Sequence, residues 1–544
     1  MSEPGFEFNS RRSAVYGRGG MVAASQPLAV AAGLKLLDAG GNAADAAVAV
    51  AAALNVTEPT STGLGGDAFA LFYQADTRQV FALNGSGRCP SGLTLERLQR
   101  EGLGASLPAY HPYTITVPGA CAAWCDLIER FGSQPLSAIL APAVNLAEQG
   151  FPVAPTTAWF WQRAAQGQLA KAVNGLELIL DGRGPRAGEI FHNKGLARTL
   201  MLIAESGKQA FYQGEIAQAI AAVVKEAGGC LAESDLAMHT STWDTPISVL
   251  HHGLRIWECP PNGQGLAALL ALNLLEGFDL AMLPPLSVDR LHVMIEAMRL
   301  AFADARAYIA DPAMMDVPLE GLLSMDYSDK RRTLIDPKRA NPSLRAGTPL
   351  AVSDTVYFSV VDCWGNACSF INSNYMGFGT GIVPRGWGFS LQNRGHNFRL
   401  DPTHPNALAP GKRPYHTIIP ALATRAQDDS LFASFGVMGG FMQPQGHLQV
   451  AVALADDHLD PQAALDQPRW CIEPEDSNGL TALEAGIPLE VMAGLAERGH
   501  PVRPVTGMGR ALFGRGQIIL RDPVTGVLCG GSDPRADGLA MATL

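Results

Sequence analysis

The chain has 544 residues, of which 47% are hydrophobic and 17% charged, so it can bury a large core and is typical of a globular protein. Its formal net charge of −11 argues against nucleic acid or an anionic membrane as partner, because phosphate binding needs clustered Lys and Arg. Nine dispersed cysteines, an odd number, do not form the pattern of a disulfide framework.

The first part of the chain gives no targeting or membrane signal. Residues 1–16 contain Arg11 and Arg12, but no apolar run of signal-peptide length follows them. The longest apolar stretch, residues 44–56, contains Asp45 and is too short to span a bilayer. We therefore expect a buried helix there and a cytoplasmic protein.

Residues 25–55 are dominated by Ala, Leu and Val, and Gly40-Gly41-Asn42 divides them into two predicted helices. A Gly-rich turn over residues 58–67 then leads into a predicted buried strand over residues 68–73. This turn lacks the Lys-Ser/Thr pair of a phosphate-binding loop and precedes a strand rather than a helix. The pattern argues against a nucleotide site.

Apolar residues at spacings of three and four predict further helices. The last of these must end before Pro312, because proline cannot continue a helix. The predicted helices cover residues 120–130, 136–148, 197–206, 214–227, 265–275 and 288–310. Residues 335–353, rich in Pro, Arg, Asn and Ser, are typical of an exposed loop.

After this loop the chain becomes rich in strands. Residues 355–362 and 367–374 are β-branched and aromatic runs joined by a short turn, which predicts a hairpin. Further strands are predicted at residues 417–423, 431–436, 517–521 and 527–530, with a helix at 446–455. A helix-rich part followed by a strand-rich part indicates a layered α/β architecture with helices outside the sheets.

Thr355 lies where the loop meets the first strand. A threonine hydroxyl is a weak nucleophile unless a base lies beside it, and a free α-amino group is such a base. Cleavage before Thr355 would place both groups on one residue, and the hydroxyl could itself attack the Asp354 carbonyl. The position alone also fits a threonine that simply favours extended backbone, so both interpretations stay open.

Short motifs are spread along most of the chain. In the second part they are residues 354–362, 365–367, 377–383, 411–414 and 530–535, and in the first part residues 40–46, 63–67, 117–119 and 146–152. In type and order, from about residue 24 to the end, these motifs resemble those of the gamma-glutamyltransferase family.

The resemblance implies an α/β fold of the N-terminal nucleophile hydrolase type, with two stacked sheets between helical layers. It implies self-cleavage between Asp354 and Thr355 into a large chain, residues 1–354, and a small chain, residues 355–544. The large chain would end in a processing loop at about residues 335–354. The two chains would remain one unit, with a homo-oligomer of that unit an open alternative. No metal or organic cofactor is required.

The resemblance also assigns roles to four residues. Thr355 corresponds to the nucleophile, and Ser373 stands at the place of a threonine that orients it. Gly439 and Gly440 match the glycine pair whose backbone N–H groups form the oxyanion hole.

Other positions depart from the family pattern for binding a γ-glutamyl group. Ser86 stands where the family has an arginine, Tyr375 replaces an asparagine, and His416 and Thr417 replace a serine pair. Asn397 replaces the aspartate that pairs with the substrate ammonium, and a neutral amide cannot supply that charge. The departures argue against ordinary γ-glutamyl specificity.

The new residues suggest a different substrate. Arg88 and Arg394, with His416 and Tyr375, could surround a small acid with cationic and hydroxyl donors. Arg394 could equally be a structural ion-pair partner. Residues 398–412 are shorter than the lid-bearing stretch of typical transferases, which favours hydrolysis over transfer.

We therefore expect an amidohydrolase that acts on a small acidic amide without an α-amino group, such as oxamate in purine-ring catabolism. An ordinary glutathione or γ-glutamyl hydrolase or transferase and a cephalosporin-acylase-like amidase remain alternatives. A non-catalytic binding module with the same fold is an alternative of another class.

Overall fold

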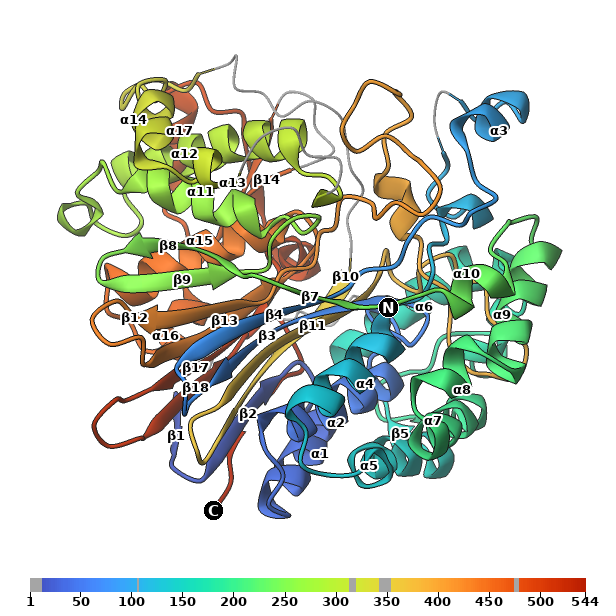
Figure 1. The fold of residues 1–544 in the computed structure, drawn as a ribbon. Helices are drawn as coiled ribbons and strands as arrows, with labels where there is room; N and C mark the ends of the chain where they lie inside the picture. The colour runs from blue at the N-terminus through green and yellow to red at the C-terminus, as the bar shows by residue number, and fades with distance from the viewer. Residues whose placement is uncertain (1–11, 105–106, 313–318, 342–353, 474–478) are drawn as a thin grey trace.

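Two stacked antiparallel sheets form the centre of the protein, and helices cover their outer faces (Figure 1). The computed structural model describes residues 12–104, 107–312, 319–341, 354–473 and 479–544. This layered arrangement agrees with the prediction. Most of the predicted processing loop, residues 342–353, lies outside the described residues.

The first sheet has seven strands, in the order β1 (Val15–Gly17), β18 (Leu528–Ser532), β17 (Arg515–Arg521), β13 (Leu431–Met438), β12 (Ala421–Arg425), β9 (Leu254–Glu258) and β8 (Ile247–His251). The second also has seven, in the order β19 (Leu539–Ala542), β2 (Gly20–Ala24), β10 (Asp354–Asp362), β11 (Ala367–Tyr375), β3 (Asp67–Gln74), β4 (Gln79–Gly85) and β7 (Thr242–Asp244). Both sheets contain strands from each side of the 354/355 bond. The two predicted chains therefore share both sheets.

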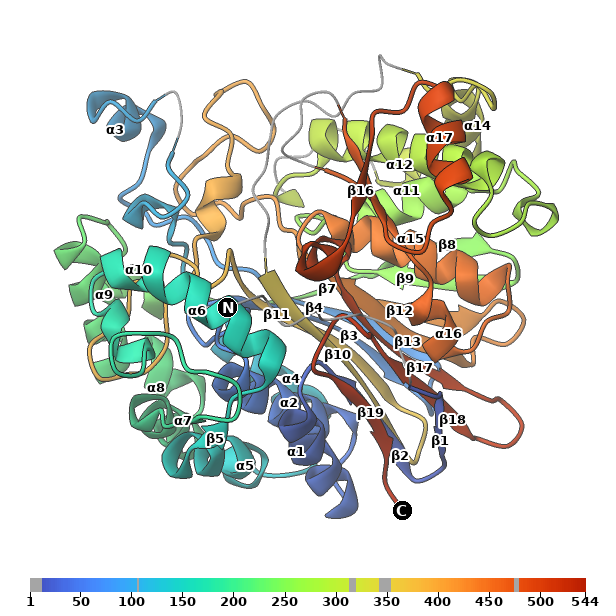
Figure 2. The same cartoon turned by 180° about the vertical axis from the view of Figure 1, so that it is seen from behind.

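Helices form two outer layers around the sheets (Figures 1 and 2). One layer contains α1 (Pro27–Asp38), α2 (Ala43–Thr57), α4 (Ala120–Phe131), α5 (Leu136–Gln149), α6 (Pro155–Gly167), α7 (Lys194–Ser206), α8 (Lys208–Tyr212), α9 (Glu215–Glu226) and α10 (Glu233–Ala237). The other contains α11 (Gly265–Leu275), α12 (Val288–Tyr308), α13 (Leu319–Leu322), α14 (Met325–Arg332), α15 (Met442–Ala455), α16 (Pro461–Asp466) and α17 (Leu489–Glu497). Among the described residues, no helix is long and apolar enough to cross a membrane.

Smaller elements complete the fold. The short helix α3 (Leu95–Arg100) lies apart from the two helical layers in Figure 1. Two small sheets consist of β14 (Trp470–Ile472), β15 (Thr481–Glu484) and β16 (Val502–Val505), and of β5 (Phe151–Pro152) and β6 (Ile190–Phe191).

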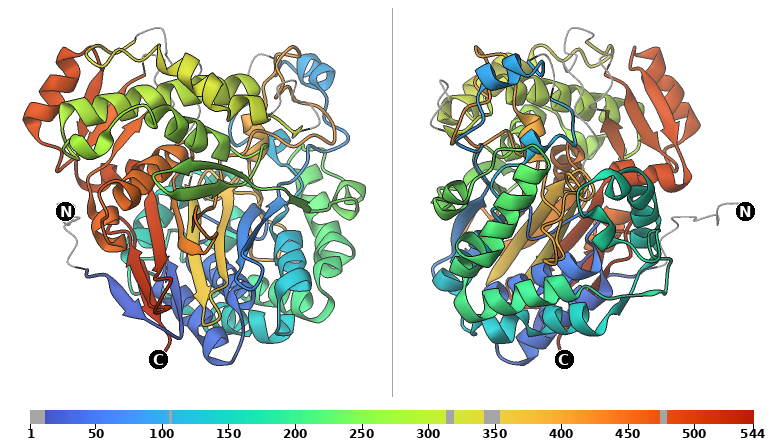
Figure 3. Two further views of the ribbon diagram at one scale, coloured as in Figure 1. Left: turned by 60° about the vertical axis from the view of Figure 1, so that its left-hand side comes forward. Right: turned by 90° about the vertical axis from the view of Figure 1, so that its right-hand side faces the viewer.

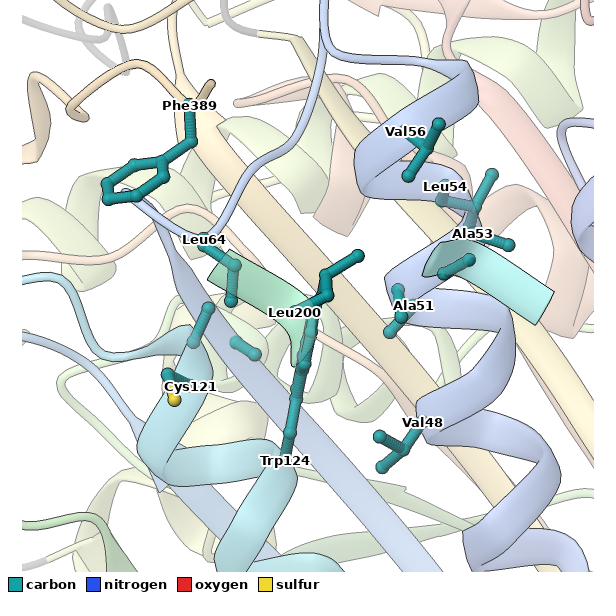
Figure 4. Close-up of a cluster of buried hydrophobic side chains, with 14 of the residues drawn as sticks. Val48, Ala51, Ala53, Leu54, Val56, Leu64, Cys121, Trp124, Leu200 and Phe389 are labelled. Carbon is teal, nitrogen blue, oxygen red and sulfur yellow. The ribbon is translucent and has the colours of Figure 1, made fainter. Parts of the chain in front are cut away.

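Helix α2 shows how the sequence builds the core. Every residue from Ala43 to Thr57 is buried, because α1 and α5 pack on one side of the helix and the β10–β11 hairpin on the other. Small Ala side chains allow this close packing, and Val48 and Leu54 reach into the cluster around Trp124 (Figure 4). An all-apolar helix is expected to be buried all round, so the prediction for residues 44–56 is confirmed.

Two predicted boundaries differ from the structure near the site. The strand expected from residue 417 begins only at Ala421, in β12. The backbone just before Ala421 is not paired with a described neighbouring strand. The Gln264 side chain donates to the Thr417 carbonyl at 2.6 Å, and Pro420 has no N–H to donate to a strand partner. Helix α15 begins four residues before the predicted start, with Pro444 in its first turn, where proline is tolerated.

Candidate active site

Thr355 is the second residue of β10, a central strand of the second sheet (Figure 3, left, yellow). The residues that follow it in β10 are mostly β-branched or aromatic, which favours the extended strand. The side chain is fully buried, and its Oγ1 donates to the Oγ of Ser373 at 3.1 Å. The structure therefore brings together the expected nucleophile and its expected orienting residue.

Ser373 is the point where three donors meet. Besides the Thr355 hydroxyl, its Oγ accepts the backbone N–H of Tyr375 at 2.9 Å and the Nη2 of Arg394 at 3.2 Å. The hydrogen bond from the Arg394 cation is charge-assisted, so it holds the Ser373 hydroxyl firmly beside the Thr355 hydroxyl.

Arg394 lies in the short helix η7 (Arg394–Asn397) and is fully buried. Its Nη1 donates to Thr417 Oγ1 at 2.7 Å, and its Cζ lies 4.4 Å from the centre of the Tyr375 ring. Burial lowers the pKa of Arg394 to about 10, although Asp67 and Tyr375 act in the opposite direction. Its Nε has no hydrogen-bond partner, and no described carboxylate oxygen lies within 4.0 Å of its nitrogens.

Tyr375 has a backbone φ of +80°, a conformation that costs a non-glycine residue energy. It pairs with Asp354 at the end of β11, directly beside the predicted cleavage site. Strained residues of this kind cluster at functional sites, where the surrounding structure holds them in place.

His416, the residue before Thr417, forms a buried pair with Asp67. His416 Nδ1 accepts the N–H of Ile418 at 3.3 Å, so we assign the ring proton to Nε2, which donates to Asp67 Oδ2 at 3.0 Å. Burial, with Arg394 and Arg413 nearby, holds the pKa of His416 well below its ordinary value. The expected cationic donor is therefore corrected to a neutral ring whose two nitrogens are both occupied.

Asp67 anchors several segments of the site. Its Oδ1 accepts the N–H groups of Gly87 and Gly119 at 3.0 and 3.1 Å and the Nε2 of Gln392 at 3.0 Å. Burial raises the pKa of this carboxyl to about 6. Asp67 is not among the predicted site residues, although a charged residue at the start of a buried apolar strand is a signal that the sequence contains.

Arg88 and Asn397 occupy different surroundings from those expected. Arg88 is partly exposed and donates to the Thr240 carbonyl at 3.2 Å, and no contact among the described residues joins it to Arg394. The Nδ2 of Asn397 donates to the Tyr415 carbonyl at 3.0 Å, while its Oδ1 is buried without a partner. Arg394 is thus the predicted arginine that the structure places beside the nucleophile.

Gly439 and Gly440 follow β13, which faces β10 across the two sheets. Ser434 donates to Ser359 at 2.9 Å, and the space above Gly436 is filled by the Tyr357 ring. From these two facing pairs, 359 with 434 and 357 with 436, we infer that Thr355 lies near the end of β13, which the two glycines follow.

The two glycines have the backbone geometry that an oxyanion hole needs. Their φ angles are +132° and +59°, and neither amide N–H donates to a described backbone acceptor. Gln264 Nε2 donates to the Gly440 carbonyl at 2.8 Å and fixes the turn. The turn leads directly into the positive N-terminal end of α15, which favours a developing negative charge.

A buried threonine at the start of a central strand, between two stacked antiparallel sheets with outer helices, defines an N-terminal nucleophile hydrolase. The family model described as Gamma-glutamyltranspeptidase matches residues 29–543. The chain belongs to the gamma-glutamyltranspeptidase family, as the sequence motifs predicted, and is an amidohydrolase of that family.

Proteins similar to this chain are named after different activities. The chain is 36% identical to the glutathione hydrolase-like YwrD proenzyme of Bacillus subtilis, covering 97% of this chain and 99% of the relative. It is 33% identical to the oxamate amidohydrolase proenzyme of Klebsiella pneumoniae, covering 96% and 98%. The crystal structure of a cephalosporin acylase from Bacillus halodurans matches with a TM-score of 0.92 and 47% identity, covering 100% and 99%.

Proposed function

We propose that the chain cuts itself between Asp354 and Thr355 and then hydrolyses linear amides whose acyl group carries a carboxylate but no α-ammonium group. Oxamate, which would give oxalate and ammonia, is the smallest such amide. The relatives named proenzymes support the cleavage step, because a proenzyme requires processing.

The observation that carries the proposal is the buried guanidinium of Arg394. Leaving a buried cation unpaired costs several kcal/mol, so an anionic ligand beside it is strongly favoured. The Nε of Arg394 is free to donate, and its Nη2 contacts the hydroxyl that holds Thr355. A carboxylate bound here would lie close to the attacking oxygen, which favours a short acid.

The absence of an α-ammonium group is supported by Asn397 and Asp67. Asn397 carries no charge and already donates to a backbone carbonyl. Both oxygens of Asp67 accept protein hydrogen bonds, and its pKa is raised by burial. Neither residue offers the free carboxylate that a buried substrate ammonium would need.

The mechanism follows from the positions of these groups. After cleavage, the α-amino group of Thr355 takes the proton from Oγ1, and this oxygen attacks the amide carbonyl. The N–H groups of Gly439 and Gly440 stabilise the oxyanion, and the proton passes to the departing amine. Water, activated by the same amino group, then hydrolyses the acyl-Thr355 ester.

A matched pair of substrates tests the proposal. Glutaryl p-nitroanilide and γ-glutamyl p-nitroanilide differ only in the α-ammonium group, and ammonia release from oxamate, malonamate and succinamate reports the preferred acid length. We expect the glutaryl compound to be hydrolysed faster than the γ-glutamyl compound, and oxamate to be the best simple amide. Faster turnover of the γ-glutamyl compound would contradict the proposal.

A further inference from the structure

A cavity of about 740 Å³ opens beside the end of β11. Its walls come from α6, from the short helix η2 (Leu169–Lys171) and from the loop after Tyr375. The residues that matter here are Phe160, Arg163, Lys171, Met376, Gly377 and Thr380. In Figure 2, α6 lies on the near side of the molecule, beside the end of β11 from which this loop starts.

Two separate chains of contacts connect this cavity to the reacting groups. Asp354 pairs with Tyr375, and the next two residues of the loop, Met376 and Gly377, line the cavity. On another wall, the guanidinium of Arg515 lies 5.1 Å from the centre of the Phe160 ring. Arg515 pairs with Met438, the residue before the oxyanion glycines. The two walls thus lead to the strand ends that carry Tyr375 and the oxyanion glycines, while the cavity itself begins at Met376, one residue beyond Tyr375.

The loop that forms one wall is held in a defined shape. Gln168 Nε2 donates to the Met376 carbonyl at 3.3 Å and also to the Gly379 carbonyl. Gly377 and Gly379 have φ angles of +53° and +65°, which glycine adopts without strain. The wall is thus already formed before a ligand binds, as in most small-molecule sites.

The charges around the cavity differ from those of the chain as a whole. The lining contains Arg163 and Lys171 and no Asp or Glu among the described residues, although the chain has a net charge of −11. Phe160 and Tyr110 add aromatic surface. Cationic donors beside aromatic rings fit a flat, partly apolar group that carries a carboxylate.

The volume is far greater than ammonia requires, since one water molecule takes up only about 30 Å³ in the liquid. It falls within the roughly 300–1,000 Å³ of pockets that hold drug-sized ligands. A primary amide such as oxamate would leave nearly all of this space unused.

We infer that the cavity is the subsite for the amine half of an N-substituted amide, and that this half is an aromatic amine bearing a carboxylate, such as an aminobenzoate. The inference rests on the proposed function, in which Arg394 holds the acyl half. In an amide, the acyl group and the amine nitrogen are attached to the carbonyl carbon and point away from it in different directions. With the acyl half fixed at Arg394, the cavity beyond Tyr375 receives the other half.

Three substrates with one acyl group test this assignment: oxamate, oxanilate and 3-carboxyoxanilate, which release ammonia, aniline and 3-aminobenzoate. We expect kcat/KM of the processed protein to rise in that order. The double variant Arg163→Gln/Lys171→Gln should lower kcat/KM for 3-carboxyoxanilate about tenfold and for oxanilate about twofold or less, because each ion pair with an exposed cation contributes a few-fold effect. Arg186→Gln, an exposed arginine away from the cavity, is the matched control.

Filling the cavity provides a second variant that does not depend on charge. Ala164→Phe should reduce turnover of both anilides while oxamate hydrolysis changes little, because ammonia does not enter the space. Equal effects of the double variant on both anilides, or unchanged anilide turnover in Ala164→Phe, would overturn the inference. If only γ-glutamyl amides are hydrolysed, the proposed function fails, and γ-glutamyl anilide with its 3-carboxy derivative then tests the subsite by the same comparison.

Discussion

Arg394 and Ser373 are joined by a hydrogen bond of 3.2 Å between Nη2 and Oγ, and the same Ser373 oxygen receives the Thr355 hydroxyl. Arg394 thus contacts the group that holds the expected nucleophile, and in the proposed function it would also bind the substrate carboxylate. On that proposal, substrate charge and nucleophile position would be coupled through this contact.

Arg394→Gln should remove this coupling. Hydrogen bonds to charged groups contribute about 1.5–3 kcal/mol, so we expect kcat/KM for acidic amides to fall roughly 10- to 150-fold. An uncharged acyl anilide should lose less, because for this substrate the variant removes only the Arg394 contact to Ser373 and no contact to a substrate carboxylate. Steady-state kinetics on glutaryl and butyryl anilides measure the difference, and equal losses for the two would show that Arg394 only supports the fold.

Protonation of Asp67 should add a second step to the acid side of the activity profile. Burial raises the pKa of Asp67 to about 6, and a free α-amino group, such as cleavage would create on Thr355, ordinarily has a pKa of about 7.7–8.0. Each Asp67 oxygen faces a donor, so a proton on either one breaks a contact. The logarithm of kcat/KM should therefore fall with slope one below pH 8 and slope two below about pH 6.

Asp67→Asn is the control for this prediction. The variant cannot titrate at this position, so its profile should keep slope one at acid pH, at a lower activity throughout. A wild-type profile with slope one down to pH 4.5 would mean that the Asp67 carboxylate does not support catalysis.

The oxyanion assignment predicts a specific effect of Gly439→Ala. A Cβ at this position would lie 3.1 Å from Gly514 Cα, and the φ of +132° is strained for alanine, so the N–H must move. Losing one oxyanion donor typically lowers kcat by about 10²–10³. Gly207→Ala, with a φ of +62° and open space around it, should cost stability but not kcat. Similar kcat values in the two variants would contradict the assignment.

His251 predicts a pH effect on stability that is separate from catalysis. Burial lowers its pKa, but hydrogen bonds to Asp456 and Glu276 outweigh burial and raise it to about 9, from 6.5. The protonated ring joins β8 to the ends of α11 and α15. A raised folded-state pKa gives stability that is fully present below pH 6.5 and is lost as pH rises through 9.

Urea unfolding at pH 6 and pH 9.5 measures this effect. The wild-type protein should lose on the order of 3 kcal/mol of unfolding free energy between these values through His251. His251→Gln should lose less across the same interval, and the exposed His192→Gln should behave like the wild type. An identical decline in His251→Gln would show that His251 is not protonated in the folded chain.

Local patterns predicted the parts of the protein that local sequence determines. The Ala-rich run gave the buried helix α2, and the hairpin after residue 354 places Ser373 on the strand that pairs with β10. Family motifs added the fold. These signals depend on residues close together in the chain or on a family resemblance, so a single sequence was enough to predict α2, the hairpin and the fold.

The contacts around Arg394 could not be predicted in the same way. Asp67 and His416 lie 349 positions apart, and Gln264 reaches Gly440 over 176 positions. No periodicity or turn pattern connects such residues, because they meet only after both sheets have formed. The surroundings of Arg88 were missed for the same reason, since its partner Thr240 lies beyond several helices in sequence.

In the proposed function, Thr355 becomes the first residue of a separate chain. Intact mass measurement of the purified protein under denaturing conditions should give two chains, of residues 1–354 and 355–544, which elute together in native buffer because both sheets contain strands from each chain. Thr355→Ala should give one uncut, inactive chain. An active wild-type protein that remains a single polypeptide of 544 residues would contradict the account.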